Sequence, residues 1–164
     1  MNWTIHEGEL DRDDVRALLA QHFAEMTAGT PPSACHVMPV DALRDLTIRF
    51  FTLRDSYASL LGCGALKCLD PTHGEIKSMR TADSALGRGV GGAILVHLIA
   101  LARASGMTRL SLETGNSALF DAANRLYQRE GFTRCEPFGG YRATEFTRFY
   151  TLSLQNNCGQ IPRL

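Results

Sequence analysis

A run of glycines just before a helical segment constrains this chain more than any other feature. The run reads Leu86-Gly87-Arg88-Gly89-Val90-Gly91-Gly92 and is followed by an apolar stripe at helical spacing. Glycines let successive backbone N–H groups converge on one point, and the start of a helix adds a positive dipole. The run therefore predicts an anion site, most naturally for a pyrophosphate, with Arg88 as an added charged contact. A simple strand-to-helix turn would need fewer glycines.

The hydrophobic pattern around this run predicts one α/β domain. Before it, we expect a strand at 3–5, a helix from residue 11 to the Gly29-Thr30-Pro31-Pro32 break, a short helix at 40–45, and an antiparallel meander at 47–54, 59–69 and 75–81. After it, we expect helices at 90–105 and 118–130, alternating with strands at 109–113, 132–136 and 146–154. We expect the domain to cover residues 1–154, and residues 155–164 to form a loose tail.

Composition excludes several classes of function. The 164 residues carry 17 Lys+Arg and 17 Asp+Glu, which gives no electrostatic reason to expect nucleic acid or an anionic membrane as partner. Five cysteines without CxxC spacing indicate reduced thiols, and five scattered histidines predict no metal site. The first residues do not resemble a signal peptide, and no apolar stretch approaches the roughly 20 residues of a membrane span. We therefore expect a cytoplasmic protein.

Charge is unevenly distributed along the chain. Residues 1–30 contain six acids and two bases, whereas residues 77–109 contain five bases and one acid. The basic region includes the glycine run, as suits an anionic ligand there.

One alternative for the glycine run is a dinucleotide site. Gly87, Gly89 and Gly92 match G-x-G-x-x-G, and Glu113 follows about twenty residues later, as in nucleotide-binding βαβ units. In those units the strand runs directly into the helix, whereas here residues 82–86 intervene, and the chain lacks a second nucleotide-binding half. A dinucleotide-binding domain therefore stays a less favoured alternative.

Three segments together resemble the GNAT (GCN5-related) N-acetyltransferases. The strand Glu75–Thr81 with the glycine run is similar to the family's strand and Arg/Gln-x-x-Gly-x-Gly/Ala loop, with Leu86 where Arg or Gln is usual. The strand 110–114 is the second segment. The third is similar to the family's A-x-x-L-Y-x-x-x-G-F, with Phe120 where Asn is often found, and reads Ala123-Asn124-Arg125-Leu126-Tyr127-Gln128-Arg129-Glu130-Gly131-Phe132.

The resemblance covers about residues 3–154 and implies a fold and a cosubstrate. The fold is a central, mostly antiparallel sheet of about six or seven strands with helices on both faces. The segments 61–66, 74–77 and 113–115 look like a bacterial subgroup of small-molecule acetyltransferases, sometimes labelled indole-acetate or amino-acid acetyltransferase-like. The implied reaction moves an acetyl group from acetyl-CoA directly to a primary amine of a small molecule, in a ternary complex.

The resemblance also implies which residues hold the cosubstrate. The backbone of the strand at Met79, Arg80 and Thr81 would pair with the pantetheine amides as an added strand does. Asn124 would contact the CoA arm. The pyrophosphate would lie on the loop residues, which are Gly87, Arg88, Gly89, Val90, Gly91 and Gly92.

Two catalytic roles, a base and an acid, have candidates in the sequence. Direct transfer needs a neutral amine, so a base must remove a proton. Glu75, the only acid on the strand beside the thioester, is the first candidate, and Glu113 is the second. Tyr127 resembles the family's general acid, and its ordinary pKa of about 10 keeps it protonated at neutral pH.

The acceptor side is the least patterned part of the chain. His22, Glu25 and His36 lie in the region that lines the acceptor site in many family members, and no cysteine has an obvious histidine partner for covalent catalysis. A protein amine stays open as the acceptor, and a homodimer is possible because dimers are frequent in the family. The competing hypothesis of another class is a non-catalytic acyl-CoA-binding module.

Overall fold

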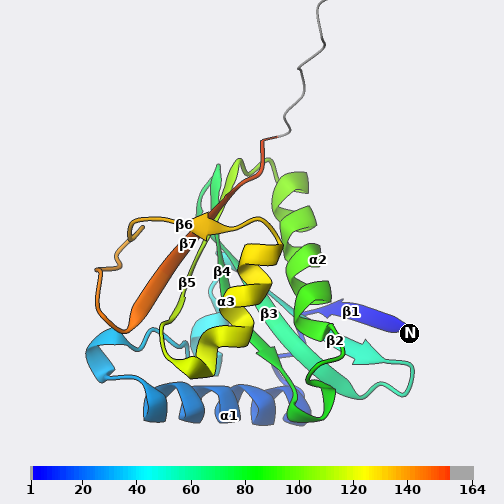
Figure 1. Cartoon of the computed structure of the whole chain (residues 1–164). Coiled ribbons are helices and arrows are strands. Elements are labelled where there is room, and N and C mark those ends of the chain that lie inside the picture. Colours follow the sequence, from blue (N-terminus) through cyan, green and yellow to red (C-terminus); the bar gives the residue numbers. More distant parts are fainter. Residues whose placement is uncertain (1, 156–164) are drawn as a thin grey trace, which may run out of the picture.

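A seven-stranded sheet with helices on both faces forms the structure, a computed structural model that describes residues 2–155 (Figure 1). The strands lie in the order β1-β2-β3-β4-β5-β7-β6. They are β1 (Trp3–Glu7), β2 (Ile48–Asp55), β3 (Leu60–Asp70), β4 (His73–Thr81), β5 (Arg109–Gly115), β6 (Thr133–Arg134) and β7 (Thr147–Ser153). The α-helices are α1 (Asp13–Gly29), α2 (Val90–Ala104) and α3 (Asp121–Arg129). The predicted fold class is confirmed.

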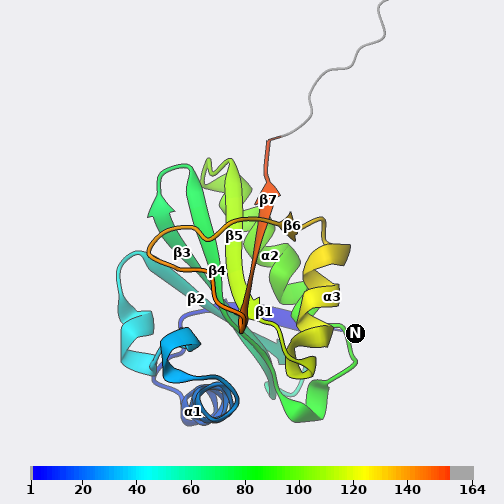
Figure 2. The same ribbon diagram turned by 60° about the vertical axis from the view of Figure 1, so that its left-hand side comes forward.

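Two hydrophobic clusters explain why helices cover both faces. Successive side chains of a strand point to opposite faces, so Phe50 and Phe51 belong to different clusters. One cluster joins Phe50 and Cys63 to the buried stripe of α1, and the other joins Phe51 to the buried stripe of α2. Figure 2 shows α1 on one side of the sheet and α2 with α3 on the other.

Glycines in β3 let α2 lie close to the sheet. A Cβ at Gly64 would lie 2.8 Å from Ile94 Cγ2, and one at Gly62 would lie 2.9 Å from Val90 Cγ1. Both distances are too short for real contacts, so larger residues would push the helix outward. The close approach places the start of α2, and the glycine run before it, beside the end of β4.

The pairing between β4 and β5 stops early. These strands are parallel and pair only from His73 with Arg109 to Glu75 with Ser111. Beyond this point β4 is bulged against β3, because Cys63 pairs with Arg80 while Ala65 pairs with Lys77. Ser78, inside the bulge, has a φ of 52°, a conformation rare for residues other than glycine. The two strands therefore diverge toward their C-terminal ends.

Several expected boundaries differ from the observed ones. The helix expected at 40–45 is a 3₁₀-helix, Val40–Arg44, and the one expected at 118–130 divides into a 3₁₀-helix, Ala118–Phe120, and α3. The strand expected at 132–136 shrinks to β6, because after Cys135 the chain leaves the sheet in a loop whose Tyr141 contacts Lys77 of β4. Of the tail expected at 155–164, residues 156–164 lie outside the described residues. No helix in residues 2–155 is both long and apolar enough to cross a bilayer.

A buried arginine fixes the start of α1 to the sheet. Arg54 on β2 is 2% exposed, and its guanidinium donates to Glu9 at 2.9 Å, to Asp14 at 2.6 Å and to the carbonyl of Ala58 at 2.9 Å. Its hydrogen bonds are the main reason why the pKa of Asp14 is lowered to about 2. This cluster holds the helix that forms one wall of the cavity described below.

We expect Arg54→Met to lower the free energy of unfolding by about 3 kcal/mol, because two carboxylates lose their buried partner. The measurement is urea denaturation at pH 7. The matched control is Arg49→Met, whose half-exposed pair with Glu7 should contribute less than about 1 kcal/mol. Equal losses in both variants would contradict a special role for Arg54.

Candidate functional site

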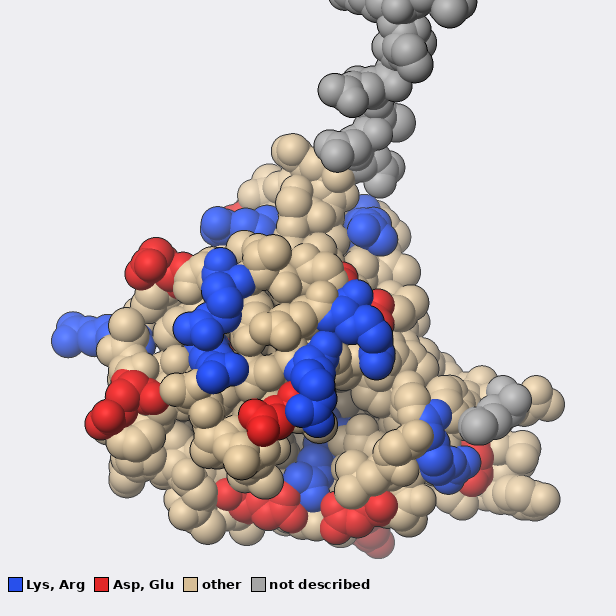
Figure 3. All heavy atoms as spheres, viewed as in Figure 1, with Lys and Arg blue, Asp and Glu red and all other residues tan. Residues whose placement is uncertain are grey.

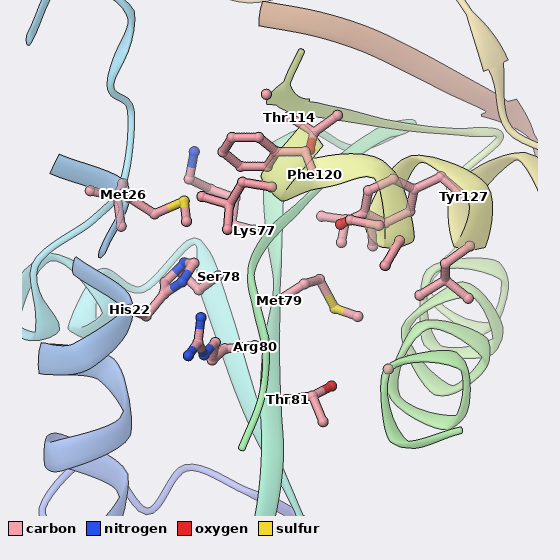
Figure 4. A pocket seen from close by; sticks show the side chains of 18 of the residues that line it. His22, Met26, Lys77, Ser78, Met79, Arg80, Thr81, Thr114, Phe120 and Tyr127 are labelled. Atoms are coloured by element: carbon pink, nitrogen blue, oxygen red, sulfur yellow. The ribbon is translucent and has the colours of Figure 1, made fainter. Parts of the chain in front are cut away.

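A cavity of about 640 Å³ occupies the gap where β4 and β5 diverge. Figure 4 shows that β4 runs through the middle of this site, with His22 and Met26 of α1 on one side and Tyr127 of α3 on the other. The side toward α2 and α3 contains the glycine run and is called the donor half. The side toward α1 and residues 34–38 is called the acceptor half.

The glycine run forms the end wall of the donor half. Gly87 and Gly89 have φ angles of 73° and 83°, which a side chain would strain, and Gly89 is the N-cap of α2. The first N–H groups of a helix have no intrahelical acceptor, and among residues 2–155 no side chain caps α2. These donors are therefore available to an anion. Arg88 is exposed and does not line the cavity, whereas the loop residues that do are Gly87, Gly89, Val90, Gly91 and Gly92.

Arg129, which the sequence reasoning did not single out, lies beside this loop. A Cβ at Gly92 would be 3.4 Å from its guanidinium, and Arg129 lines the cavity. Its position two residues after Tyr127 in the third family segment could have drawn attention to it. Figure 3 shows acidic side chains along the lower edge of this face, over α1, and Lys and Arg side chains higher up, around α3.

The predicted strand residues line the cavity in different ways. Met79 and Thr81 face the gap left by β5. The guanidinium of Arg80 turns instead toward α1, where it binds Glu25 at 2.5 and 3.1 Å, and it also binds Asp83, just after β4, at 3.1 Å. Only the backbone of Arg80 is therefore free for a ligand in the donor half.

Glu75 is engaged by two residues that the sequence reasoning missed. Its side chain is buried, with 3% of the residue exposed, and it accepts hydrogen bonds from Lys77 Nζ at 3.0 Å and from the Tyr141 hydroxyl. Lys77 also donates to the Tyr141 hydroxyl at 2.7 Å. Tyr141 comes from the loop between β6 and β7, where no periodicity signalled a contact with β4.

Glu113 lies in the same cavity in a different environment. Burial raises its pKa to about 7, while nearby Lys77 lowers it and nearby Glu75 raises it further. Within residues 2–155, no side chain donates a hydrogen bond to its carboxylate. Glu113 thus has a pKa close to the operating pH, which is what a proton acceptor needs.

Tyr127 faces the cavity from α3. Burial and the neighbouring charge of Glu113 raise its pKa, so its hydroxyl stays protonated and can donate at neutral pH. Its ring packs near those of Phe132 and Tyr150.

Asn124 holds protein groups together rather than lining the cavity. It is 4% exposed and donates to the carbonyls of Gly115 at 3.1 Å and Phe120 at 2.9 Å. Its side-chain oxygen accepts from the Tyr150 hydroxyl at 2.8 Å. The contact with CoA expected for Asn124 stays a prediction, and its present contacts indicate a structural role.

The acceptor half contains the three residues proposed from the sequence, His22, Glu25 and His36. Burial and nearby Arg80 lower the pKa of His22 to about 4, and burial with nearby Lys77 lowers that of His36. Both rings are therefore neutral at pH 7. Among the described residues, no group of three His, Cys, Asp or Glu side chains could hold a metal ion.

Comparisons with known proteins agree with this geometry. The sequence profile described as the Acetyltransferase (GNAT) family matches residues 17–132. The uncharacterized N-acetyltransferase YedL of Escherichia coli is 43% identical over 94% of this chain and 97% of its own length, and YsnE of Bacillus subtilis, with the same description, is 42% identical over 89% and 96%. A GNAT family acetyltransferase of Elizabethkingia anophelis, solved with acetyl-CoA bound, has a TM-score of 0.61 and 21% identity, covering 93% and 98% of the two chains.

We expect Asn124→Ala to lower the free energy of unfolding by about 2–3 kcal/mol, because buried polar partners lose their hydrogen bonds. The affinity for CoA, measured by calorimetry well below the unfolding temperature, should change less than about twofold. Gln128→Ala is the matched control, since this exposed residue contacts the same Tyr150 hydroxyl only at 3.4 Å. Weaker CoA binding at unchanged stability would instead support a direct contact.

Proposed function

Because this chain belongs to the GNAT family of acetyltransferases, we propose that it transfers the acetyl group of acetyl-CoA directly to the primary amine of a small molecule. The predicted family and the predicted class of enzyme, an acyltransferase, are confirmed by the comparisons. The class of acceptor, a small-molecule primary amine, and direct transfer in a ternary complex are the parts that the proposal adds.

The observation that carries the proposal is the divergence of β4 and β5 in front of the glycine run. The free backbone of Met79, Arg80 and Thr81 offers the edge of a strand to the pantetheine amides. The uncapped start of α2 offers N–H groups to the pyrophosphate. Leu86, which is 63% exposed, supplies no charged contact, and Arg129 beside Gly92 offers one from α3. The solved relative with acetyl-CoA bound supports the same choice of cosubstrate.

The two halves of the cavity supply the chemistry of direct transfer. The amine nitrogen attacks the thioester carbonyl, the C–S bond breaks, and the amine loses a proton. Glu113 accepts this proton, since Glu75 is engaged by Lys77 and Tyr141. Tyr127 donates a proton or a strong hydrogen bond to the leaving thiolate. This assignment reverses the order of the two candidate bases expected from the sequence.

We expect acetyl-CoA and CoA to bind by calorimetry, NAD(P)H not to bind, and amines to release CoA thiol from acetyl-CoA. Gly89→Ala should weaken acetyl-CoA binding about tenfold, because its positive φ strains any side chain. Gly140→Ala is the control, since its added Cβ would meet nothing within 4 Å. Binding of acetyl-CoA without thiol release from any amine would favour a non-catalytic acyl-CoA-binding module.

We expect kcat/KM to rise with pH through about 7, because the base must be deprotonated, and Glu113→Gln to abolish this limb and lower kcat about 100-fold or more. Glu75→Gln should retain the limb and shift it to lower pH, because a like charge near Glu113 is removed. The measurement is a pH profile of thiol release with one amine. A limb that disappears in Glu75→Gln and persists in Glu113→Gln would show that Glu75 is the base.

A further inference from the structure

We propose that the acceptor is a primary amine whose remaining body is apolar and uncharged, and that acceptors with a carboxylate beside the amine are rejected. This inference rests on the proposed function and specifies the substrate class of the same site. Three features of the site support it: the walls of the acceptor half are apolar, its cations are paired with carboxylates, and Glu75 and Glu113 lie beside it.

The walls of the acceptor half are apolar. Met26 comes from α1, and Phe120 faces it from the 3₁₀-helix before α3 (Figure 4). Phe120 can lie there only because residue 115 is glycine, since a Cβ at Gly115 would lie 2.1 Å from its ring carbons. Further apolar lining residues are Val37, Met38, Leu119 and Phe146. These side chains favour an aliphatic or aromatic body over a polar one.

The two cations that line the acceptor half already have anionic partners. Lys77 contacts Glu75 at 3.0 Å and the Tyr141 hydroxyl at 2.7 Å. Arg80 contacts Glu25 at two points and Asp83 at 3.1 Å, and Gln21 donates to both of these carboxylates at 2.9 Å. A carboxylate on the substrate would therefore have to compete with bound protein carboxylates. In the part of the cavity between α1 and β4, the described residues offer no other Lys or Arg.

At the end of the site where the amine reacts, the carboxylates favour a positively charged group of the acceptor. Glu75 and Glu113 both line the cavity, and Glu75 lies close enough for its charge to raise the pKa of Glu113. Because Lys77 balances the charge of Glu75, Glu113 is the carboxylate without a bound cation, and in its deprotonated form it attracts a protonated amine and repels a carboxylate beside it. The rings of His22 and His36 are neutral and add no positive charge, and the buried Nδ1 of His22 and Nε of Arg80, which have no hydrogen-bond partner among the described residues, can accommodate at most a small polar group of the acceptor.

The test compares amines with the amino acids that differ from them only by the carboxylate. The pairs are phenethylamine with phenylalanine, tryptamine with tryptophan, and isoamylamine with leucine, each assayed by CoA thiol release. We expect kcat/KM to favour the amine at least tenfold in every pair that reacts. Equal or better turnover of the amino acids overturns the inference, and so does turnover of spermidine without turnover of these amines. Absence of turnover with every amine, despite binding of acetyl-CoA, overturns the proposed function instead.

A single substitution tests the reason for the preference. Glu25→Gln removes one anionic partner of Arg80, so we expect the amine-to-amino-acid ratio to fall at least fivefold through a lower KM for the amino acid. The control is Asp41→Asn, an exposed acid that pairs with Arg44 outside the cavity, which should leave the ratio unchanged. An unchanged ratio in a folded Glu25→Gln protein that still binds acetyl-CoA contradicts the role assigned to neutralised cations.

Discussion

The site depends on one feature of the sheet, the separation of β4 from β5 after three paired residues. Backbone groups inside a fold need partners, and a gap between neighbouring strands leaves two rows of them free. The bulge at Ser78 bends β4 away from β5. On its other side β4 stays in the sheet, because its pairing with β3 resumes at Arg80. The edge of β4 that faces β5 therefore keeps free backbone N–H and C=O groups inside the cavity, where a ligand can hydrogen-bond to them in place of a strand.

The separation of β4 from β5 can serve ligand binding only because the backbone N–H donors at the start of α2 lie close to it. Gly62 and Gly64 let α2 approach the sheet, so the uncapped helix start faces the free edge of β4. On the other face, the Arg54 cluster fixes α1, which carries Met26 and Glu25 into the acceptor half. The two helices therefore set the two halves of the cavity independently, from opposite sides of the sheet.

The sequence predicted the features that depend on local pattern. Alternation and turn residues located the meander, helical spacing located α1 and α2, and the motif with Tyr127 identified the family and so the diverging strands. Contacts between distant segments were not predictable. Tyr141 meets Glu75 across 66 residues of sequence, from a loop without periodicity. The environment of Glu113 and the inward turn of Asn124 likewise depend on packing that no single segment reveals.

The contrast between Glu75 and Glu113 shows how one cavity can contain two carboxylates with different roles. Lys77 and Tyr141 occupy Glu75 with hydrogen bonds, so in the proposed reaction the released proton passes to Glu113, whose pKa is raised by burial. Glu75 in turn neutralises the charge of Lys77. Under the proposed mechanism, the hydrogen bonds that set Glu75 apart from Glu113 also pair the cation that a carboxylate-bearing acceptor would need, so that proton transfer and acceptor selection would have a common structural origin.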